Sequence, residues 1–403
     1  MMYRIIFLIC LGLLAGCSMT EKLGSYLKSD KDNAEPPAPL VEFKQGLNVI
    51  ELWSESTGSG TKEQYLNLAP IIVNQRLYVV DVFGRIKCLD ATNGDTIWAK
   101  DMKDIGDSKL KFWSEAESET ITGGPGYGEN TILIGTSEGR VIAYSADKGE
   151  ELWRANVTSE VLSAPQRHNN IVIVRTLDGK IFALDGRSGK HLWNHDRTVP
   201  NLTLRGTSAP VIVDDIVIAG SDGGQLAALE LQTGRLLWEA PITESRGVTD
   251  IERMVDIDST PVVMKSVIYV ATYRGDLVAI NMETGRESWR RDVSSYAGFS
   301  ADDNNIYITD EDSHIWALDR YTGNSIWKQE KLHAREATAA SIVGDYIVVG
   351  DVEGYLHWLS KDTGDFVART RITKDRIIVK PVVLGKYLYA YSSDGTLAAY
   401  TYR

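Results

Sequence analysis

The chain has 403 residues, of which 43% are hydrophobic, and its formal net charge is −12 at pH 7. A chain of this length can bury a large apolar core. The acidic balance argues against nucleic acid and anionic membrane surfaces as partners, because both would favour a basic face.

The chain begins with a short leader that carries one positive charge, Arg4, followed by an apolar run over residues 5–15. The run has the length of a signal peptide and is too short to span a bilayer as a stable helix. It ends in Leu-Ala-Gly before Cys17, which resembles the lipobox of bacterial lipoproteins. The resemblance implies cleavage of residues 1–16, lipid attachment at Cys17 and, because Ser18 is not Asp, delivery to the outer membrane. The alternative is an ordinary signal peptide with a chance cysteine.

The segment that follows, within residues 17–39, is polar, ends in prolines and lacks a sustained apolar period. We expect it to be a flexible tether that connects the lipidated cysteine to a domain over residues 40–403. With Cys10 in the leader and Cys17 lipidated, Cys88 is left without a cysteine partner. A disulfide framework is therefore excluded.

A short phrase, typified by "DGRSGKHLW" at residues 185–193, occurs seven times and ends in tryptophan in six of them. The phrase aligns on a glycine, and successive glycines are 38 to 55 residues apart: Gly94, Gly149, Gly189, Gly234, Gly285, Gly323 and Gly364. The unit that begins at residue 207 contains four apolar runs separated by turn residues, without helical periodicity. A period of this length with four short strands is typical of a β-propeller blade.

A second turn, at the start of each third strand, occurs eight times and thus indicates eight blades. The last unit ends before its fourth strand, whereas residues 48–56 supply an isolated strand of the same apolar-x-Trp pattern. We therefore predict an all-β fold: an eight-bladed β-propeller of four-stranded antiparallel blades, closed by the N-terminal strand completing the last blade. Closure removes exposed strand edges.

Seven tryptophans occupy one equivalent position of this repeat, and we expect their rings to pack between neighbouring blades: Trp53, Trp98, Trp153, Trp193, Trp238, Trp289 and Trp327. The seventh unit has Ala368 there, which predicts a differently packed junction. The repeated glycines supply the positive φ of a tight turn. The phrase is therefore assigned to the scaffold.

The blade phrase also resembles the repeat of quinoprotein dehydrogenases, which bind pyrroloquinoline quinone in an eight-bladed propeller. Those enzymes use a calcium site, an Asp base and a disulfide of adjacent cysteines, and this chain has no adjacent cysteines. No segment groups carboxylates and amides in a calcium arrangement, and the six histidines are scattered without metal-ligand spacing. We predict no catalytic, cofactor-binding or metal residue, and keep a quinone-dependent dehydrogenase, or a degenerate relative of one, as the alternative.

The whole chain resembles the BamB family, lipoprotein subunits of the machinery that inserts β-barrels into the outer membrane. Three stretches outside the repeat carry the resemblance: "LTLRGTSAP" at 202–210, "IERMVDIDSTP" at 251–261 and "GDVEGYLHWL" at 350–359. The departures from the family pattern are mild, such as Glu252 for Asp and Met254 for Leu. The resemblance implies a non-enzymatic scaffold that binds the periplasmic POTRA region of BamA.

The predicted topology places the first two of these stretches in long connections that flank the same blade, so we expect them to lie side by side. Long loops on a rigid scaffold commonly carry binding sites. The resemblance implies partner contacts by five residues: Leu202, Leu204, Arg205, Asp256 and Asp258. On residue type alone, the leucines fit a buried strand. The aspartates alternatively cap or solvate their loop.

A third long connection, around Trp113, either folds over the ring or marks another contact, and the sequence does not choose between them. The resemblance further implies association with other Bam lipoproteins through the complex and leaves contact with nascent outer-membrane proteins open. It places the propeller in the periplasm, on the membrane only through its lipid.

Overall fold

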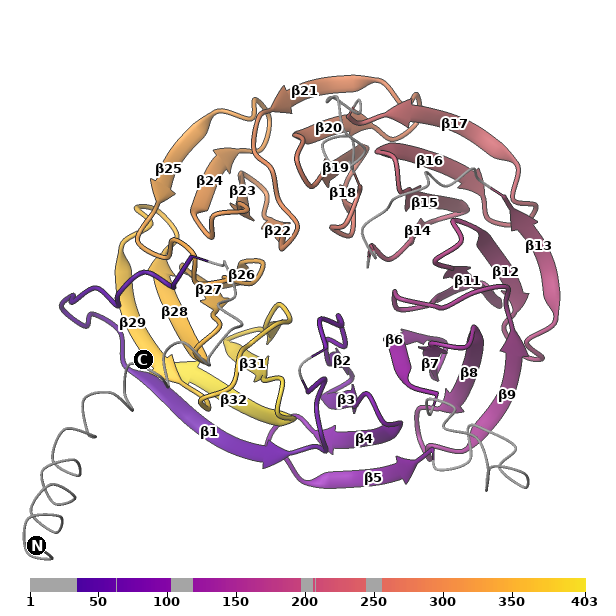
Figure 1. Ribbon diagram of the computed structural model, residues 1–403, viewed down its shortest axis with the longest axis horizontal. Coiled ribbons are helices and arrows are strands. Elements are labelled where there is room, and N and C mark those ends of the chain that lie inside the picture. Colours follow the sequence, from indigo (N-terminus) through magenta and orange to yellow (C-terminus); the bar gives the residue numbers. More distant parts are fainter. Residues whose placement is uncertain (1–34, 63, 103–118, 197–205, 207, 244–255) are drawn as a thin grey trace, which may run out of the picture. The chain divides into compact units, whose positions relative to one another are not determined.

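The computed structural model describes residues 35–62, 64–102, 119–196, 206, 208–243 and 256–403. All regular secondary structure in these ranges is β-strand, and no helix there is long and apolar enough to cross a membrane. The strands form a ring of eight four-stranded sheets within the compact unit Ala38–Arg403 (Figure 1). This confirms the predicted eight-bladed propeller. The leader (1–16) and the tether (17–39) stay predictions, because residues 1–34 lie outside the described part.

Each blade runs from an inner to an outer strand, and the sheets are numbered here in chain order. Blade 1 consists of β2 (Ile71–Val73), β3 (Arg76–Val80), β4 (Arg85–Asp90) and β5 (Thr96–Asp101), and blade 2 of β6 (Ile121–Gly128), β7 (Thr131–Thr136), β8 (Arg140–Ser145) and β9 (Glu151–Asn156). Blade 3 consists of β10 (Gln166–His168), β11 (Ile171–Arg175), β12 (Ile181–Asp185) and β13 (His191–His195). Blade 4 consists of β14 (Val211–Val213), β15 (Ile216–Gly220), β16 (Gln225–Glu230) and β17 (Leu236–Pro241).

Blades 5 to 8 follow the same plan. Blade 5 consists of β18 (Val262–Met264), β19 (Val267–Ala271), β20 (Leu277–Asn281) and β21 (Glu287–Arg291), and blade 6 of β22 (Gly298–Ala301), β23 (Asn305–Thr309), β24 (Ile315–Asp319) and β25 (Ser325–Gln329). Blade 7 consists of β26 (Ser341–Val343), β27 (Tyr346–Gly350), β28 (Tyr355–Ser360) and β29 (Phe366–Arg371). Blade 8 consists of β30 (Val382–Leu384), β31 (Tyr387–Tyr391), β32 (Thr396–Tyr402) and β1 (Val49–Ser56).

The ring closes in blade 8, where the N-terminal strand β1 is the outer strand. It pairs antiparallel with β32, from Val49 opposite Tyr402 to Ser56 opposite Thr396. The chain ends are also joined, because the amides of Asn48 and Arg403 each donate to the other residue's carbonyl. The predicted closure by the N-terminal strand is thus confirmed.

The apolar core of the described ring is divided into eight clusters, one at each junction between neighbouring blades. At seven junctions a repeat tryptophan lies against the turn between the third and fourth strands of the next blade. Trp193, for example, donates from Nε1 to the Leu231 carbonyl at 3.0 Å. A β-carbon on Gly234, whose φ is +72°, would lie 2.5 Å from Cε3 of Trp193. The glycine is therefore required both by its backbone and by the ring of the preceding blade.

The exception at Ala368 has a structural reason. The next blade is blade 8, whose third and fourth strands are β32 and β1, so no turn joins them and no tryptophan is needed to cover one. Trp358 fills this junction instead, and its ring lies 6.0 Å from that of Tyr402 and 6.5 Å from that of Tyr346. The predicted difference in packing is confirmed.

Candidate functional site

Two of the three long connections flank blade 4, as the sequence predicts. One joins β13 to β14 and the other joins β17 to β18, and their described ends contact each other. Ser208 Oγ donates to the Ser259 carbonyl at 3.2 Å, and the Ala209 amide donates to Thr260 Oγ1 at 3.3 Å. Leu202, Leu204 and Arg205 lie outside the described residues, as does the segment around Trp113.

Asp256 is a buried part of this face, with only 1% of its surface exposed. Its Oδ1 accepts from the Gly223 amide at 3.1 Å, and its backbone forms an isolated antiparallel bridge with Asp222 in the β15–β16 turn. Its carbonyl accepts from the Tyr273 amide at 3.1 Å. Asp256 thus ties the connection to turns of blades 4 and 5, in line with the capping role that its sequence position left open.

Arg175, at the end of β11, joins the β13–β14 connection and the β15–β16 turn to blade 3 and was not singled out by the sequence analysis. Its guanidinium forms a buried ion pair with Asp222 and donates to the carbonyls of Gly206 and Ser208 at 3.4 and 3.3 Å. The sequence repeat held a clue to this residue. The second strands of other blades end in small or uncharged residues, such as Gly220 and Ala271, at the position that Arg175 occupies in blade 3. A charge at a buried repeat position indicates a paired ion.

Asp258 has a strongly perturbed titration. Burial, together with the neighbouring Asp256 and Asp222 carboxylates, raises the pKa of its carboxyl to about 7 against the lowering effect of Arg175. Its Oδ1 is buried without a hydrogen-bond partner among the described residues, and a β-carbon on Gly206 would lie 2.8 Å from it. The Asp258 carboxyl therefore lies beside Gly206, which directly follows Arg205 in the sequence.

The same carboxyl lines a cavity of about 670 Å³ near the centre of the ring. The walls come from the segments that precede the inner strands of blades 5, 6, 7, 8 and 1, and are mostly apolar. Lys380 stands in the wall, and its residue is exposed to solvent. At the rim, Arg376 pairs with Glu336 and donates to Tyr65 Oη. The cavity can hold a small or extended ligand, and Asp258 connects it to the face around blade 4.

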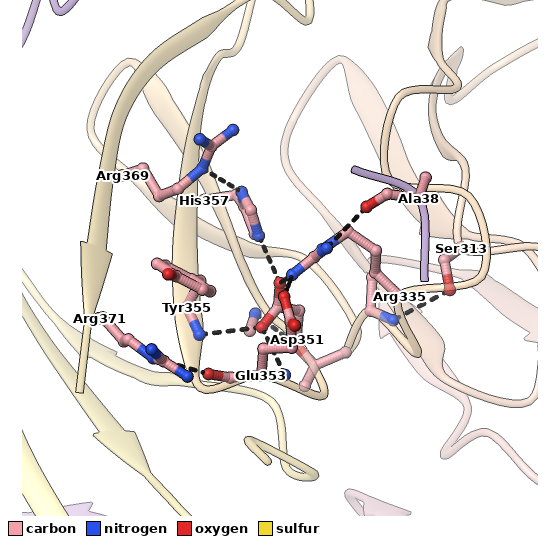
Figure 2. Close-up of polar contacts among 12 residues, drawn as sticks. Ala38, Ser313, Arg335, Asp351, Glu353, Tyr355, His357, Arg369 and Arg371 are labelled. Atoms are coloured by element: carbon pink, nitrogen blue, oxygen red, sulfur yellow. Dashed lines mark hydrogen bonds and ion pairs between the residues drawn. The ribbon is translucent and has the colours of Figure 1, made fainter. Parts of the chain in front are cut away.

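The third stretch of the resemblance, residues 350–359, forms a separate buried network in blade 7 (Figure 2). Asp351 Oδ2 lies 2.8 Å from His357 Nε2 and accepts from Arg335 Nε at 2.8 Å. Arg369 Nε donates to His357 Nδ1 at 3.3 Å, so Nδ1 carries no proton and Nε2–H donates to Asp351. Burial lowers the pKa of His357, which favours this neutral ring.

This network holds the start of the propeller chain rather than a substrate. Arg335 Nη1 donates to the Ala38 carbonyl at 2.7 Å, and Arg369 Nη2 donates to the Val41 carbonyl at 3.1 Å. Phe43 stacks on Phe366 with ring centroids 5.6 Å apart. Because Asp351 and His357 are fully buried, they are inaccessible to an external reactant.

Comparisons with known proteins agree on one family. The profile described as "Outer membrane protein assembly factor BamB" matches residues 82–329. The protein of that name from Xanthomonas campestris pv. campestris is 35% identical over 99% of this chain and 98% of its own. The crystal structure of BamB from Moraxella catarrhalis has a TM-score of 0.76 and 27% identity, covering 88% of this chain and 99% of that chain.

An enzyme with the same architecture is more distant. Quinohemoprotein alcohol dehydrogenase from Comamonas testosteroni has a TM-score of 0.68 but 13% identity, covering 88% of this chain and 76% of that chain. This likeness shows the propeller fold alone.

Proposed function

This chain belongs to the BamB family of outer membrane protein assembly factors, and we propose that it is a non-enzymatic scaffold subunit that binds the periplasmic POTRA region of BamA. Membership of the Bam complex follows from the family. The choice of BamA as the direct partner rests on the resemblance of residues 202–210 and 251–261 to the family's binding stretches.

The observation that carries the proposal is the joining of these two stretches around blade 4. Ser208 and Ala209 contact Ser259 and Thr260 directly. Arg175 on β11 holds the first connection through the carbonyls of Gly206 and Ser208. Its ion pair with Asp222 holds the β15–β16 turn, which bridges to Asp256 of the second connection. The described ends of the two connections are thus already fixed before a partner binds, which lowers the entropy cost of ordering them and favours affinity.

Within this surface, we assign different roles to the five residues of the sequence prediction. Leu202, Leu204 and Arg205 form the proposed binding centre, since arginine beside apolar residues is a common interface hot spot. Asp258 is the proposed acidic neighbour that meets a basic group of the partner. Asp256 supports the surface from below through its hydrogen bond with Gly223.

Capture from detergent-solubilised envelopes tests the complex itself. The full-length lipoprotein should retain BamA and the other Bam lipoproteins, identified by mass spectrometry, and the Arg205→Ala variant should retain much less. A matched control is Arg235→Ala, which removes an exposed arginine in the β16–β17 turn on the opposite face of the ring. Equal recovery of BamA with both variants would contradict the proposed surface.

The proposed location is the periplasmic side of the outer membrane, through a lipid on Cys17. Several acyl chains would make this anchor nearly permanent, because each buried methylene contributes roughly 0.8 kcal/mol. We expect Cys17→Ala to give an unprocessed or soluble product in fractionated cells. The same variant should be tested in cells that lack the other Bam subunits. A lipid anchor would be contradicted if the variant stayed in the outer membranes of these cells after a high-salt wash.

The proposal excludes quinone-dependent oxidation of a substrate. The chain lacks the adjacent cysteines of quinoprotein dehydrogenases, and Cys88 is buried. Incubation with pyrroloquinoline quinone and calcium, followed by removal of free quinone, should leave no quinone absorbance with the protein. Stoichiometric retention together with dye reduction by an alcohol or sugar would favour the enzyme alternative.

A further inference from the structure

Two histidines that are distant in the sequence meet on blade 6. His314 lies in the β23–β24 turn and His333 in the connection from β25 to β26. Their ring centroids are 5.3 Å apart, with the ring planes inclined by 21°. Asp312 lies in the same turn as His314, and one potential ligand atom from each of the three residues lies within 4.8 Å of the others. The group is partly accessible to solvent, so an ion could enter without unfolding.

The ring of His314 is oriented by a carboxylate behind it. Asp310 Oδ2 lies 3.0 Å from His314 Nδ1 and accepts from Trp316 Nε1 at 2.8 Å. Its Oδ1 accepts from the amides of Asp312 and His314 at 3.0 and 2.8 Å. A metal-binding histidine commonly donates its second ring N–H to a carboxylate, which directs the other nitrogen toward the ion. Asp310 thus supplies the support that such a ligand needs and leaves Nε2 of His314 for coordination.

We propose that Asp312, His314 and His333 bind a zinc ion, with water as the fourth ligand. Two imidazoles and one carboxylate are typical Zn²⁺ ligands, whereas Ca²⁺ and Mg²⁺ prefer oxygen ligands alone. With Zn–N bonds of about 2.0–2.1 Å, two imidazoles on a tetrahedral ion have ring centroids about 5.2 Å apart. The observed 5.3 Å matches this separation. The exposed Asp312 would supply the third ligand atom, which lies within 4.8 Å of the two imidazole nitrogens.

The ion would connect the β23–β24 turn to the connection that holds the beginning of the propeller chain. The Ala334 amide donates to the Asp312 carbonyl at 3.0 Å, and the Ala38 amide donates to the His333 carbonyl at 3.0 Å. Zinc would therefore clamp the β23–β24 turn to the connection on which Ala38 rests. An ion that binds only the folded state also stabilises it. The gain in stability grows with the logarithm of the ratio of the free ion concentration to Kd.

Calorimetric titration of Zn²⁺ into the full mature lipoprotein in detergent, without a polyhistidine tag, tests the site. We expect one ion per chain, and at least a tenfold weaker Kd for each of Asp312→Asn, His314→Gln and His333→Gln. Asp310→Asn retains the three ligands and should weaken binding by about 10- to 100-fold. The control His191→Gln alters an exposed histidine on β13 and should leave Kd unchanged.

Two further measurements separate coordination from misfolding and from weak surface binding. Melting curves without metal should be similar for wild type and Asp312→Asn, whose side chain is exposed, and added Zn²⁺ should raise the melting temperature of wild type alone. Co²⁺ should give visible absorption bands of a tetrahedral site that disappear in His333→Gln. Absence of stoichiometric Zn²⁺ binding, or an unchanged Kd in His333→Gln, would overturn the proposal.

Discussion

Replacing Asp258 by asparagine should make the protein more stable at neutral and alkaline pH. Burial raises the pKa of Asp258 from 3.8 to about 7 in the folded chain. The unfolded chain releases this proton near pH 4, whereas the folded chain keeps it until about pH 7. Between these values the unfolded state binds fewer protons, so the contribution of Asp258 to stability is present below pH 4 and is lost as the pH rises to 7.

The size of the effect follows from the pKa difference. At about 1.4 kcal/mol for each pKa unit, full ionisation in the folded state costs at most about 4 kcal/mol above pH 7. The side chain borders an open cavity, so we expect about 2 kcal/mol after screening. Asparagine has a similar shape and never ionises. The stability difference between Asp258→Asn and wild type should therefore grow from pH 5 to pH 8.

Equilibrium urea unfolding at pH 5, 6, 7 and 8 measures this difference. Asp362→Asn, which alters an exposed carboxylate in the β28–β29 turn, is the matched control and should run parallel to wild type. Parallel pH profiles for Asp258→Asn and wild type would refute a raised pKa at this position. If the free energy of unfolding of the variant instead fell further below that of wild type as the pH rises, the sign of the predicted effect would be wrong.

Other predictions concern the scaffold. Gly234→Ala combines a left-handed backbone with a β-carbon 2.5 Å from the Trp193 ring, so it should cost about 2–4 kcal/mol in urea unfolding. Gly385→Ala, at a position with φ +60° and open space around it, should cost about 1 kcal/mol. Gly234→Ala should cost the same small amount when Trp193 is also replaced by alanine. An equal cost of Gly234→Ala with and without the Trp193 ring would contradict the ring contact. Deletion of residues 18–37 should leave the melting temperature near wild type, whereas deletion of 40–55 removes β1 and should cause aggregation; equal stability of the two would contradict ring closure by β1.

The fold was predictable because a propeller repeats its physical constraints in sequence. Each blade needs a tight turn with positive φ, a tryptophan ring to cover the turn of the next blade, and four short apolar runs. The glycines and tryptophans therefore recur together. Even the irregular position, Ala368, was informative. Its cause is the missing turn between β32 and β1, which becomes visible only when the chain ends are paired.

The polar sites were less predictable, since their members come from turns and connections that are distant in the sequence. Arg175 and Asp222 are 47 residues apart, and no local motif links them. His314 and His333 lack metal-ligand spacing, yet the β23–β24 turn and the next connection lie on one face and bring them together. The burial of Asp256 depends on a turn of the neighbouring blade, so alternation along its own segment could not reveal it.

Titration of purified BamA periplasmic domain against the mature lipoprotein and its Arg205→Ala and Leu204→Ala variants, with a melting curve for each, tests the proposed binding face most directly. We expect Arg205→Ala to lose about 2 kcal/mol or more of binding free energy, roughly a thirtyfold rise in Kd, while melting near wild type. Leu204→Ala should lose affinity alone, whereas a buried leucine would cost about 2–5 kcal/mol of folding stability. Wild-type Kd in both variants would contradict binding of BamA through this face.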